Sequence, residues 1–254
     1  MSVNEFAFER LIRLSMGSYP RLSQVHKFGT NTAVTATEEA VWSAGGAYTF
    51  PTTAETVRVK AGGNAADDQD GGAGMRTLTV QGLDETWAEA SESINTEGAD
   101  VGSATTTTFR RIFRAFGTVV GAYGAANTAA INIENSSTNT VLAQIAAGQG
   151  QTQMAVYTVP LGKRAYLVSM VRSVSTNQDA SVRLYQRQNA NDTATPFSGV
   201  KRLIHIADGL IGGDAIDFPL MPNFPAKTDI WAAAVGPAGG ASVSVDFNLI
   251  LVDD

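Results

Sequence analysis

The stretch MRTLTVQGLDETWAEASESI, residues 75–94, decides the fold class of this chain. It opens with apolar residues at alternate positions, Leu78 and Val80, separated by threonines, which is the pattern of a strand with one buried face. Gly82 interrupts this run, a polar turn follows, and a second extended run begins at Trp87. Two such runs joined by a short turn predict a β-hairpin, which is the smallest unit of an antiparallel sheet.

The same alternation recurs along the chain, and we therefore predict an all-β fold. The segment FRRIFRAF, residues 109–116, has apolar positions that a helix would also allow. The four threonines before it and the glycine and valines after it favour a strand. Turn-forming residues separate the runs at spacings typical of a sandwich or jelly roll. Up to residue 159, the predicted strands are 33–37, 39–43, 47–50, 55–60, 76–81, 86–94, 106–116, 128–134, 140–146 and 152–159.

A break at the PLG segment, residues 160–162, divides the strands into two groups, so we predict two β-sandwich or jelly-roll-like modules. The predicted domains are residues 33–159 and 160–254, and a single larger sandwich is the alternative. The last strand carries apolar residues on one face from Val243 to Leu251, so it must belong to a core. The predicted strands of the second group are 165–174, 180–188, 199–207, 214–220, 227–235 and 241–252.

Residues 1–32 are predicted to form a short helix followed by an extended arm. Ser2 and Glu5 stand at capping-box spacing at the start of a helix over residues 2–16, and Gly17 stands where a C-terminal cap belongs. An isolated helix of this length is marginal in water, so it docks either on its own β domain or on a neighbouring subunit. In the second interpretation, the candidate partner-binding residues are Phe6, Phe8, Leu11, Ile12, Leu14 and Tyr19.

The composition argues against nucleic acid and membrane partners. The formal net charge is −6, and the 18 lysine and arginine residues are scattered, with the densest group at Arg110, Arg111 and Arg114. Proteins that bind nucleic acid normally carry a basic patch. No apolar run approaches the roughly 18 residues of a membrane span. Charged residues make up only 17% of the chain, and a polar, weakly charged surface suits burial against other protein copies.

Metal and cofactor sites are not expected in this chain. The absence of cysteine excludes disulfides and cysteine-ligated zinc. The best metal candidate is the loop AGGNAADDQDGGAG, residues 61–74, which contains Asp67, Asp68 and Asp70. The first and last positions of an EF-hand, counted on this loop, lack carboxylates. We therefore expect a solvated loop rather than a calcium site.

A catalytic site is not expected either, and we predict that the protein is not an enzyme. His26 lies in the predicted connector and His205 in an alternating strand, and the sequence has no G-x-S-x-G nucleophile motif. The GK dipeptide lacks the rest of a P-loop. Glu89 and Glu92 are three positions apart on a predicted strand and therefore face opposite sides, which does not suit a glycosidase pair.

Four segments carry a resemblance to a known class of protein. WSAGGAYTFP, AETVRV, RTLTVQGLDETWAEASESI and YTVPLGK, spread over residues 26–163, resemble virion structural proteins of tailed bacteriophages, above all short-tailed phages of aquatic bacteria. The resemblance implies a non-enzymatic particle component, assembled in the host bacterial cytoplasm and located in the virion. Our first hypothesis is a capsid decoration or cement protein, a homotrimer that bridges and stabilises capsomers by binding the major capsid protein or other virion proteins.

Two other roles in the particle remain open at this point. The chain could be a receptor- or glycan-binding module of a head or tail fibre, with Trp42, Trp87 and Trp231 as stacking surfaces. Each of these tryptophans lies in or beside a predicted strand, where packing into a core is the more frequent environment. The chain could also be a head-to-tail adaptor or tail component, because the same β pattern would serve that role.

Overall fold

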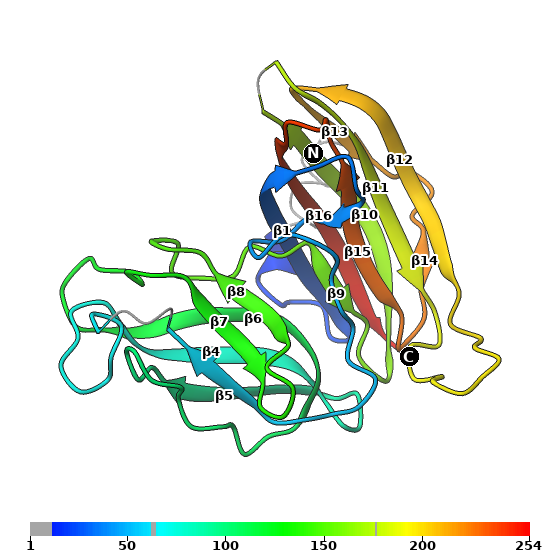
Figure 1. The fold of residues 1–254 in the computed structure, drawn as a ribbon. Helices are drawn as coiled ribbons and strands as arrows, with labels where there is room; N and C mark the ends of the chain where they lie inside the picture. Colours follow the sequence, from blue (N-terminus) through cyan, green and yellow to red (C-terminus); the bar gives the residue numbers. More distant parts are fainter. Residues whose placement is uncertain (1–11, 62–64, 176) are drawn as a thin grey trace.

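Four antiparallel sheets make up the computed structural model, which describes residues 12–61, 65–175 and 177–254 (Figure 1). The predicted all-β class with two sandwich-like modules is confirmed. The larger one, here called the sandwich module, consists of sheets A and B. Sheet A contains β1 (Leu22–Val34), β16 (Ala241–Asp253), β10 (Lys163–Val174) and β13 (Gly213–Asp217) in that order, with β14 (Asn223–Phe224) beside β10; sheet B contains β12 (Lys201–Ile211), β11 (Asp179–Arg187), β15 (Asp229–Val235) and β2 (Glu39–Ala40) in that order, with β9 (Val156–Thr158) beside β15.

The core of the sandwich module lies between sheets A and B because their strands alternate between buried and exposed residues. Every second residue of β16 from Val243 to Leu251 is at most 1% exposed, which confirms the prediction for the last strand. These side chains pack with the inward residues of sheet B in one apolar cluster. Burying a side chain of this size contributes about 1.5–3 kcal/mol. β16 pairs with β1 on one edge and β10 on the other, so it is the central strand of sheet A.

The smaller of the two modules, here called the inserted module, is formed by the chain between β2 and β9. Its two three-stranded sheets share one apolar cluster, so each sheet buries one face against the other. The FRRIFRAF segment lies within a strand of this module, as predicted. Sheet C contains β3 (Val57–Lys60), β7 (Ile131–Asn135) and β8 (Val141–Ile145); sheet D contains β5 (Glu89–Asn95), β4 (Met75–Asp84) and β6 (Phe109–Val120), each in that order.

Two connections join the modules, and they lie side by side. Trp42 on the way out forms a β-bridge with Met154 on the way back, and the amide of Ala155 donates to the carbonyl of Val41 at 3.0 Å. β1 crosses this point at Gly29, where an added Cβ would lie 2.3 Å from the Val41 oxygen. The two connections and β1 are therefore in close backbone contact, with no room for a side chain between them.

The sheets group the strands differently from the predicted domain boundaries, residues 1–32, 33–159 and 160–254. β1 falls mostly within the predicted arm, yet it pairs with β16 from Leu22 to Val34. β9 precedes residue 160 but pairs with β15 of the sandwich module. The predicted connector is therefore the end strand of sheet A. The sequence did not indicate this, because the partner strand lies more than 200 residues away, beyond the reach of any local pattern.

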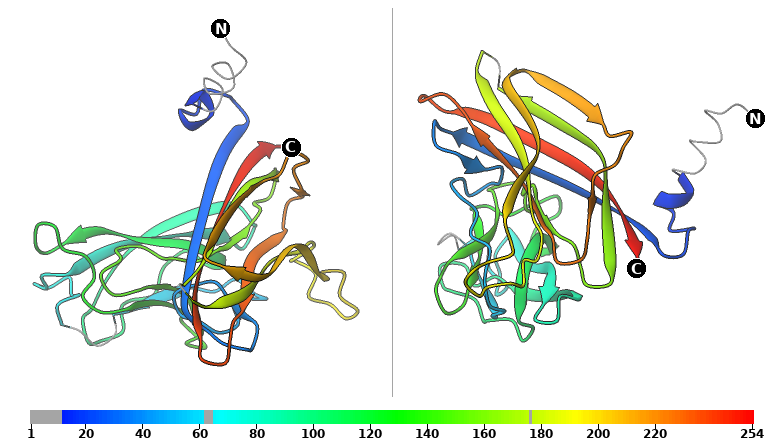
Figure 2. Two further views of the ribbon diagram at one scale, coloured as in Figure 1. Left: turned by 90° about the horizontal axis from the view of Figure 1, so that it is seen from above. Right: turned by 90° about the vertical axis from the view of Figure 1, so that its right-hand side faces the viewer.

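One helical turn, residues 12–15, precedes β1 in the described part of the chain. Figure 2 places it beyond the N-terminal end of β1. It ends as predicted at Gly17, whose φ is +66°. The amide of Ser18 donates to the carbonyl of Arg13, and that of Gly17 donates to Leu14, which is a Schellman motif. Within the described residues, no helix is long and apolar enough to cross a membrane.

The hairpin of residues 75–94 is confirmed, but its turn lies further along than predicted. β4 continues through Gly82 to Asp84, and β5 begins at Glu89 rather than Trp87. The carboxylate of Asp84 accepts from the amides of Thr86 and Ala88, which closes the turn. Gly82 is not a strand breaker here. It permits close contact with β6, because an added Cβ would lie 1.9 Å from the Arg111 carbonyl oxygen.

We expect Gly82→Ala to destabilise the inserted module. The methyl group would meet backbone rather than a movable side chain, so β4 and β6 must separate at about 1–3 kcal/mol. The measurement is the midpoint of thermal unfolding. Gly239→Ala is the control, because an added Cβ there has no atom within 4 Å and the φ of Gly239 is not positive. Equal midpoints for the two variants would contradict the close contact.

Candidate functional site

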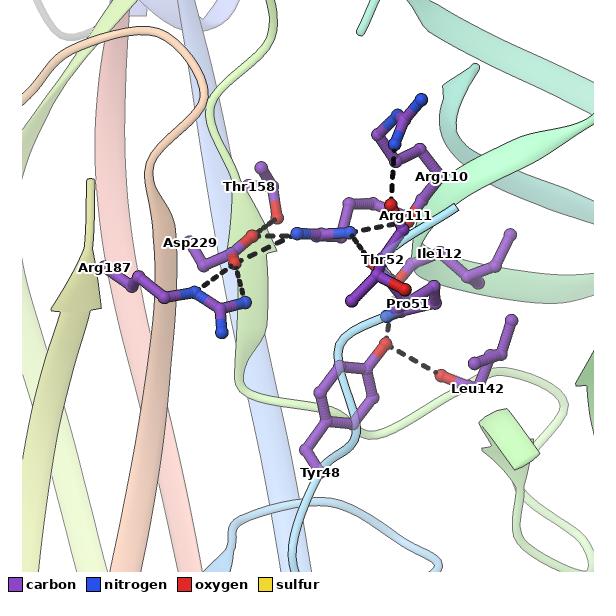
Figure 3. Close-up of polar contacts among 10 residues, drawn as sticks. All are labelled: Tyr48, Pro51, Thr52, Arg110, Arg111, Ile112, Leu142, Thr158, Arg187 and Asp229. Carbon is purple, nitrogen blue, oxygen red and sulfur yellow. Dashed lines mark hydrogen bonds and ion pairs between the residues drawn. The ribbon is translucent and has the colours of Figure 1, made fainter. Parts of the chain in front are cut away.

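A buried ion pair joins the two modules (Figure 3). Asp229, at the start of β15 in the sandwich module, is fully buried. Arg111, from β6 in the inserted module, donates to its two carboxylate oxygens from Nε at 2.8 Å and Nη2 at 3.1 Å. Thr158 donates its hydroxyl to the same carboxylate at 2.7 Å, and Arg187 approaches it from β11. The carboxylate thus has partners on three strands of the sandwich and inserted modules besides its own.

Arg111 is held on every side. Its Nη1 donates to the carbonyls of Pro51 and Arg110. Its guanidinium lies 5.4 Å from the ring centre of Phe50 and 5.0 Å from that of Trp87. The side chain is only 2% exposed. A guanidinium is planar and weakly hydrated, so it is the cation best suited to this stacked and bidentate position. A lysine would keep the positive charge but could not make the two parallel hydrogen bonds to Asp229 or stack flat on the aromatic rings.

A second buried cation lies at the contact between β1 and β6. Lys27 is 7% exposed, and its ammonium donates to the carbonyl of Phe113. Burial and, to a smaller extent, the positive charge of Arg114 together lower the pKa of Lys27 to about 7. The modules are therefore also joined by a buried lysine whose hydrogen-bond acceptor is a neutral carbonyl and not a carboxylate.

A groove opens beside the ion pair, and we call it the joint groove. It consists of two adjacent cavities of about 550 and 300 Å³. The two cavities share Phe50, Arg187 and Gly199. One wall is the segment that leads into the inserted module, and the other is the outer face of sheet B with the loop after β11. Tyr48 is anchored below it, because its hydroxyl donates to the carbonyl of Leu142 at 3.1 Å.

Glu38 organises the charges at one end of the joint groove. Burial alone would raise its pKa, but hydrogen bonds from Lys201, Tyr185 and Arg183 outweigh burial and lower the pKa to about 2. Lys201 also lies 3.8 Å from the ring centre of Tyr185, over its face. The carboxylate therefore remains ionised at any physiological pH and fixes the positions of its three partners.

The predicted partner-binding residues are distributed as follows. Phe6, Phe8 and Leu11 lie outside the described residues. Ile12 is 43% exposed and Tyr19 is partly exposed. Leu14 is 8% exposed and lines a cavity with Val25 and other residues of sheet A. The list of residues thus divides between an exposed and a buried set, and their role in partner binding stays a prediction.

The Asp-rich loop is organised by its backbone. Asp67 is fully buried, which differs from the expected solvated loop. Its carboxylate accepts from the amides of Met75, Thr128 and Ala129, each at 2.9 Å. Asp68 accepts from the amide of Asp70 at 2.8 Å. Asp67 therefore joins the loop to a distant segment of the inserted module, as a buried carboxylate must when it has no cation beside it.

The other ionisable residues considered in the sequence lie apart from the joint groove. Nε2 of His205 is 2.7 Å from Nη1 of Arg172, and desolvation and the charge of Arg172 lower the histidine pKa. Glu89 lies 3.6 Å from the ammonium of Lys163. Glu92 accepts from the amides of Thr106 and Thr107. These contacts account for each side chain without a shared cleft.

The ion pair between the two modules was not predicted from the sequence. The densest basic group in the sequence consists of Arg110, Arg111 and Arg114. An arginine that points inward from a strand needs a carboxylate partner. The partner, Asp229, is 118 residues away and has no motif around it. Trp231, assigned to core packing, is instead partly exposed in the joint groove. Trp42 and Trp87 are buried as expected, at 5% and 4% exposure.

Comparisons with known proteins add little to this description. No protein-family model matches the chain, and no curated protein matches it. Solved structures that align include a subviral particle of infectious bursal disease virus VP2, at 10% identity over 96% of this chain and 77% of that chain, with a TM-score of 0.27. An empty virus-like particle of cowpea mosaic virus aligns at 10% identity over 80% and 79%, with a TM-score of 0.21. These scores are too low to carry an argument about fold or function.

We expect Asp229→Asn to destabilise the protein strongly. The change leaves two buried or half-buried guanidinium groups facing a neutral amide, and breaking a buried pair in this way costs about 3–5 kcal/mol. The measurement is the free energy of unfolding from urea denaturation. Asp246→Asn is the control, because Asp246 is 42% exposed and only approaches His26 at 3.7 Å. A loss no larger than that of the control would mean that the ion pair does not hold the modules together.

We expect the stability of the protein to rise with pH through Lys27. The folded-state pKa, about 7, lies below the ordinary value of 10.5, so the unfolded chain binds more protons between these values. Its contribution to the free energy of unfolding therefore increases from about pH 7 to about pH 10. Lys27→Met should flatten that slope, while the exposed Lys60→Met should not. Parallel slopes for wild type and Lys27→Met would show that Lys27 titrates normally.

Proposed function

We propose that the chain is a structural component of a bacteriophage particle, and specifically a capsid decoration or cement protein. The proposal joins the resemblance of residues 26–163 to phage virion proteins with one structural observation, the open apolar edge of the sandwich module. The major capsid protein is the expected partner, and the role needs no catalytic residue. The virion is the expected location.

The open edge is formed by β12 and β13, the end strands of sheets B and A. A single residue, Gly212, separates them in the chain, and Figure 1 shows β12 along the outside of the sandwich module. Leu203, Ile206 and Ile211 of β12 are 48%, 38% and 70% exposed. Soluble proteins normally protect a long apolar edge strand, because its free amides and carbonyls pair readily with another strand. Such an edge supports a role in assembly.

The partner best suited to this edge is another copy of the chain. In a cyclic assembly, β12 of one copy can meet β13 of the next, and soluble homo-oligomers usually have closed symmetry. We propose a homotrimer, in which β12 and β13 face the neighbouring copies. Three weak capsid contacts per trimer would then act together and bind far more tightly than one.

The N-terminal segment is the proposed attachment to the capsid. In the described part, Ile12 and Met16 are 43% and 74% exposed, although burial of side chains of this kind is favourable. The described helical turn, residues 12–15, also lies beyond the sheets (Figure 2). A deletion test must stop before Leu22, because removing residues 1–25 would also remove the first residues of β1 and uncover β16.

Deletion of residues 1–18 is expected to abolish binding to particles while leaving the β fold intact. Each apolar side chain withdrawn from an interface loses about 1.5–3 kcal/mol. The measurement is co-sedimentation with phage particles that lack the protein, beside circular dichroism. If the truncated chain binds particles normally, the N-terminal segment is not the attachment to the capsid.

The double variant Ile206→Lys, Ile211→Lys should convert the trimer to a monomer in light scattering. Val101→Lys is the control and should not, because Val101 is exposed on the inserted module. If the wild-type protein is a monomer in light scattering, the proposed trimer is wrong.

A further inference from the structure

The joint groove has the dimensions of a ligand site. Its two cavities, of about 550 and 300 Å³, each fall within the range of about 300–1,000 Å³ that small-molecule sites occupy. They lie next to each other, because Phe50, Arg187 and Gly199 line both. A ligand extended along the groove would touch both modules, since Phe50 and Thr53 belong to one wall and Gly199 and Phe197 to the other.

The walls of the joint groove offer aromatic faces that are held in place. Tyr48, Phe50 and Trp231 are each partly exposed there. Their rings are fixed edge to face, with centroids 4.8 Å apart for Tyr48 and Phe50 and 5.2 Å apart for Phe50 and Trp231. Tyr185 stacks on Trp231 at 5.5 Å. Phe197, on the rim, is 59% exposed. Such faces suit a flat ligand ring with an apolar side.

The polar groups of the joint groove combine donors and acceptors without excess charge. Three exposed threonines, Thr52, Thr53 and Thr193, are among the lining residues. Three carboxylates and three cations are among the lining residues, and each already has a partner. Glu38 pairs with Lys201, Arg111 and Arg187 pair with the buried Asp229, and Asp192 and Glu39 accept from backbone amides. A charged ligand would leave an ion unpaired, whereas a neutral ligand with many hydroxyl groups would not. The charged lining residues are Glu38, Glu39, Asp192, Arg111, Arg187 and Lys201.

We propose that the joint groove binds a neutral oligosaccharide. The apolar face of one sugar ring stacks on Phe197, the most exposed aromatic ring of the groove, and neighbouring sugars contact the exposed parts of Trp231 and Phe50. The sugar hydroxyl groups exchange hydrogen bonds with the threonines and accept from Arg187. Arg187 suits this role because its guanidinium lies 4.8 Å from the ring centre of Phe50 and its side chain is 30% exposed. This binding activity goes beyond the decoration role and does not depend on it. It would give the particle a contact with a glycan-covered surface.

The test is a titration of the full chain with maltohexaose, cellohexaose and chitohexaose, followed by tryptophan fluorescence. Trp231 lines the groove, so binding changes its emission, and Trp231→Phe removes that change. Phe197→Ala should weaken binding by about tenfold, the worth of one aromatic contact. It should leave the fold intact, because Phe197 is on an exposed loop. Tyr123→Ala is the matched control, since Tyr123 is fully exposed outside the groove.

Binding of a neutral oligosaccharide that Phe197→Ala weakens and Tyr123→Ala does not would support the proposal. Three outcomes would overturn it: no response to any of the three neutral probes, a response only to anionic polygalacturonate oligomers, or equal affinity for wild type and Phe197→Ala. Each leaves the decoration proposal standing, because that proposal is tested by particle co-sedimentation and light scattering with variants that lie outside the groove.

Discussion

The ion pair between Arg111 and Asp229 is the contact on which the arrangement of the two modules depends. Two charges removed from water are stable only when every donor and acceptor has a partner, and here the inserted module supplies the cation while the sandwich module supplies the anion. The pair therefore forms only at one relative orientation of the modules. The position of Phe50 is fixed as well, because its ring stacks on both Arg111 and Arg187. The joint groove exists because its two walls are fixed in this way.

The fold separates two kinds of surface. The edge strand β12 is long and exposes Leu203, Ile206 and Ile211 among its polar residues, which suits pairing with protein strands. The joint groove is aromatic, hydroxyl-lined and neutral, which suits a smaller ligand with many hydrogen-bonding groups. Lys201 begins β12 and also lines the groove, but the exposed apolar residues Leu203, Ile206 and Ile211 do not line it. Contacts through these apolar residues would therefore leave the groove accessible. Decoration of a capsid and recognition of a saccharide are therefore compatible in one chain.

Local pattern predicted most of the strands because side-chain alternation is imposed by the strand itself. The alternation in β16 is an example. The end of the helical turn at Gly17 was also predicted, because a capping glycine is a local signal as well. Features that depend on distant partners were missed or misplaced. The pairing of β1 with β16 joins segments more than 200 residues apart, and Asp229 meets Arg111 across 118 residues. Gly82 resembles a strand breaker in sequence, and only the close passage of β6 explains it.

The adjacent connections at Trp42 and Met154 have an evolutionary consequence. A segment whose two ends leave the host at neighbouring points can be gained, lost or exchanged without disturbing the order of the host strands. The sandwich strands on either side, β2 and β9, both pair with β15 and would still do so. Recombination between related genes could thus replace residues 43–153 as one cassette. The groove would change with each replacement, while the edge formed by β12 and β13 would be inherited intact.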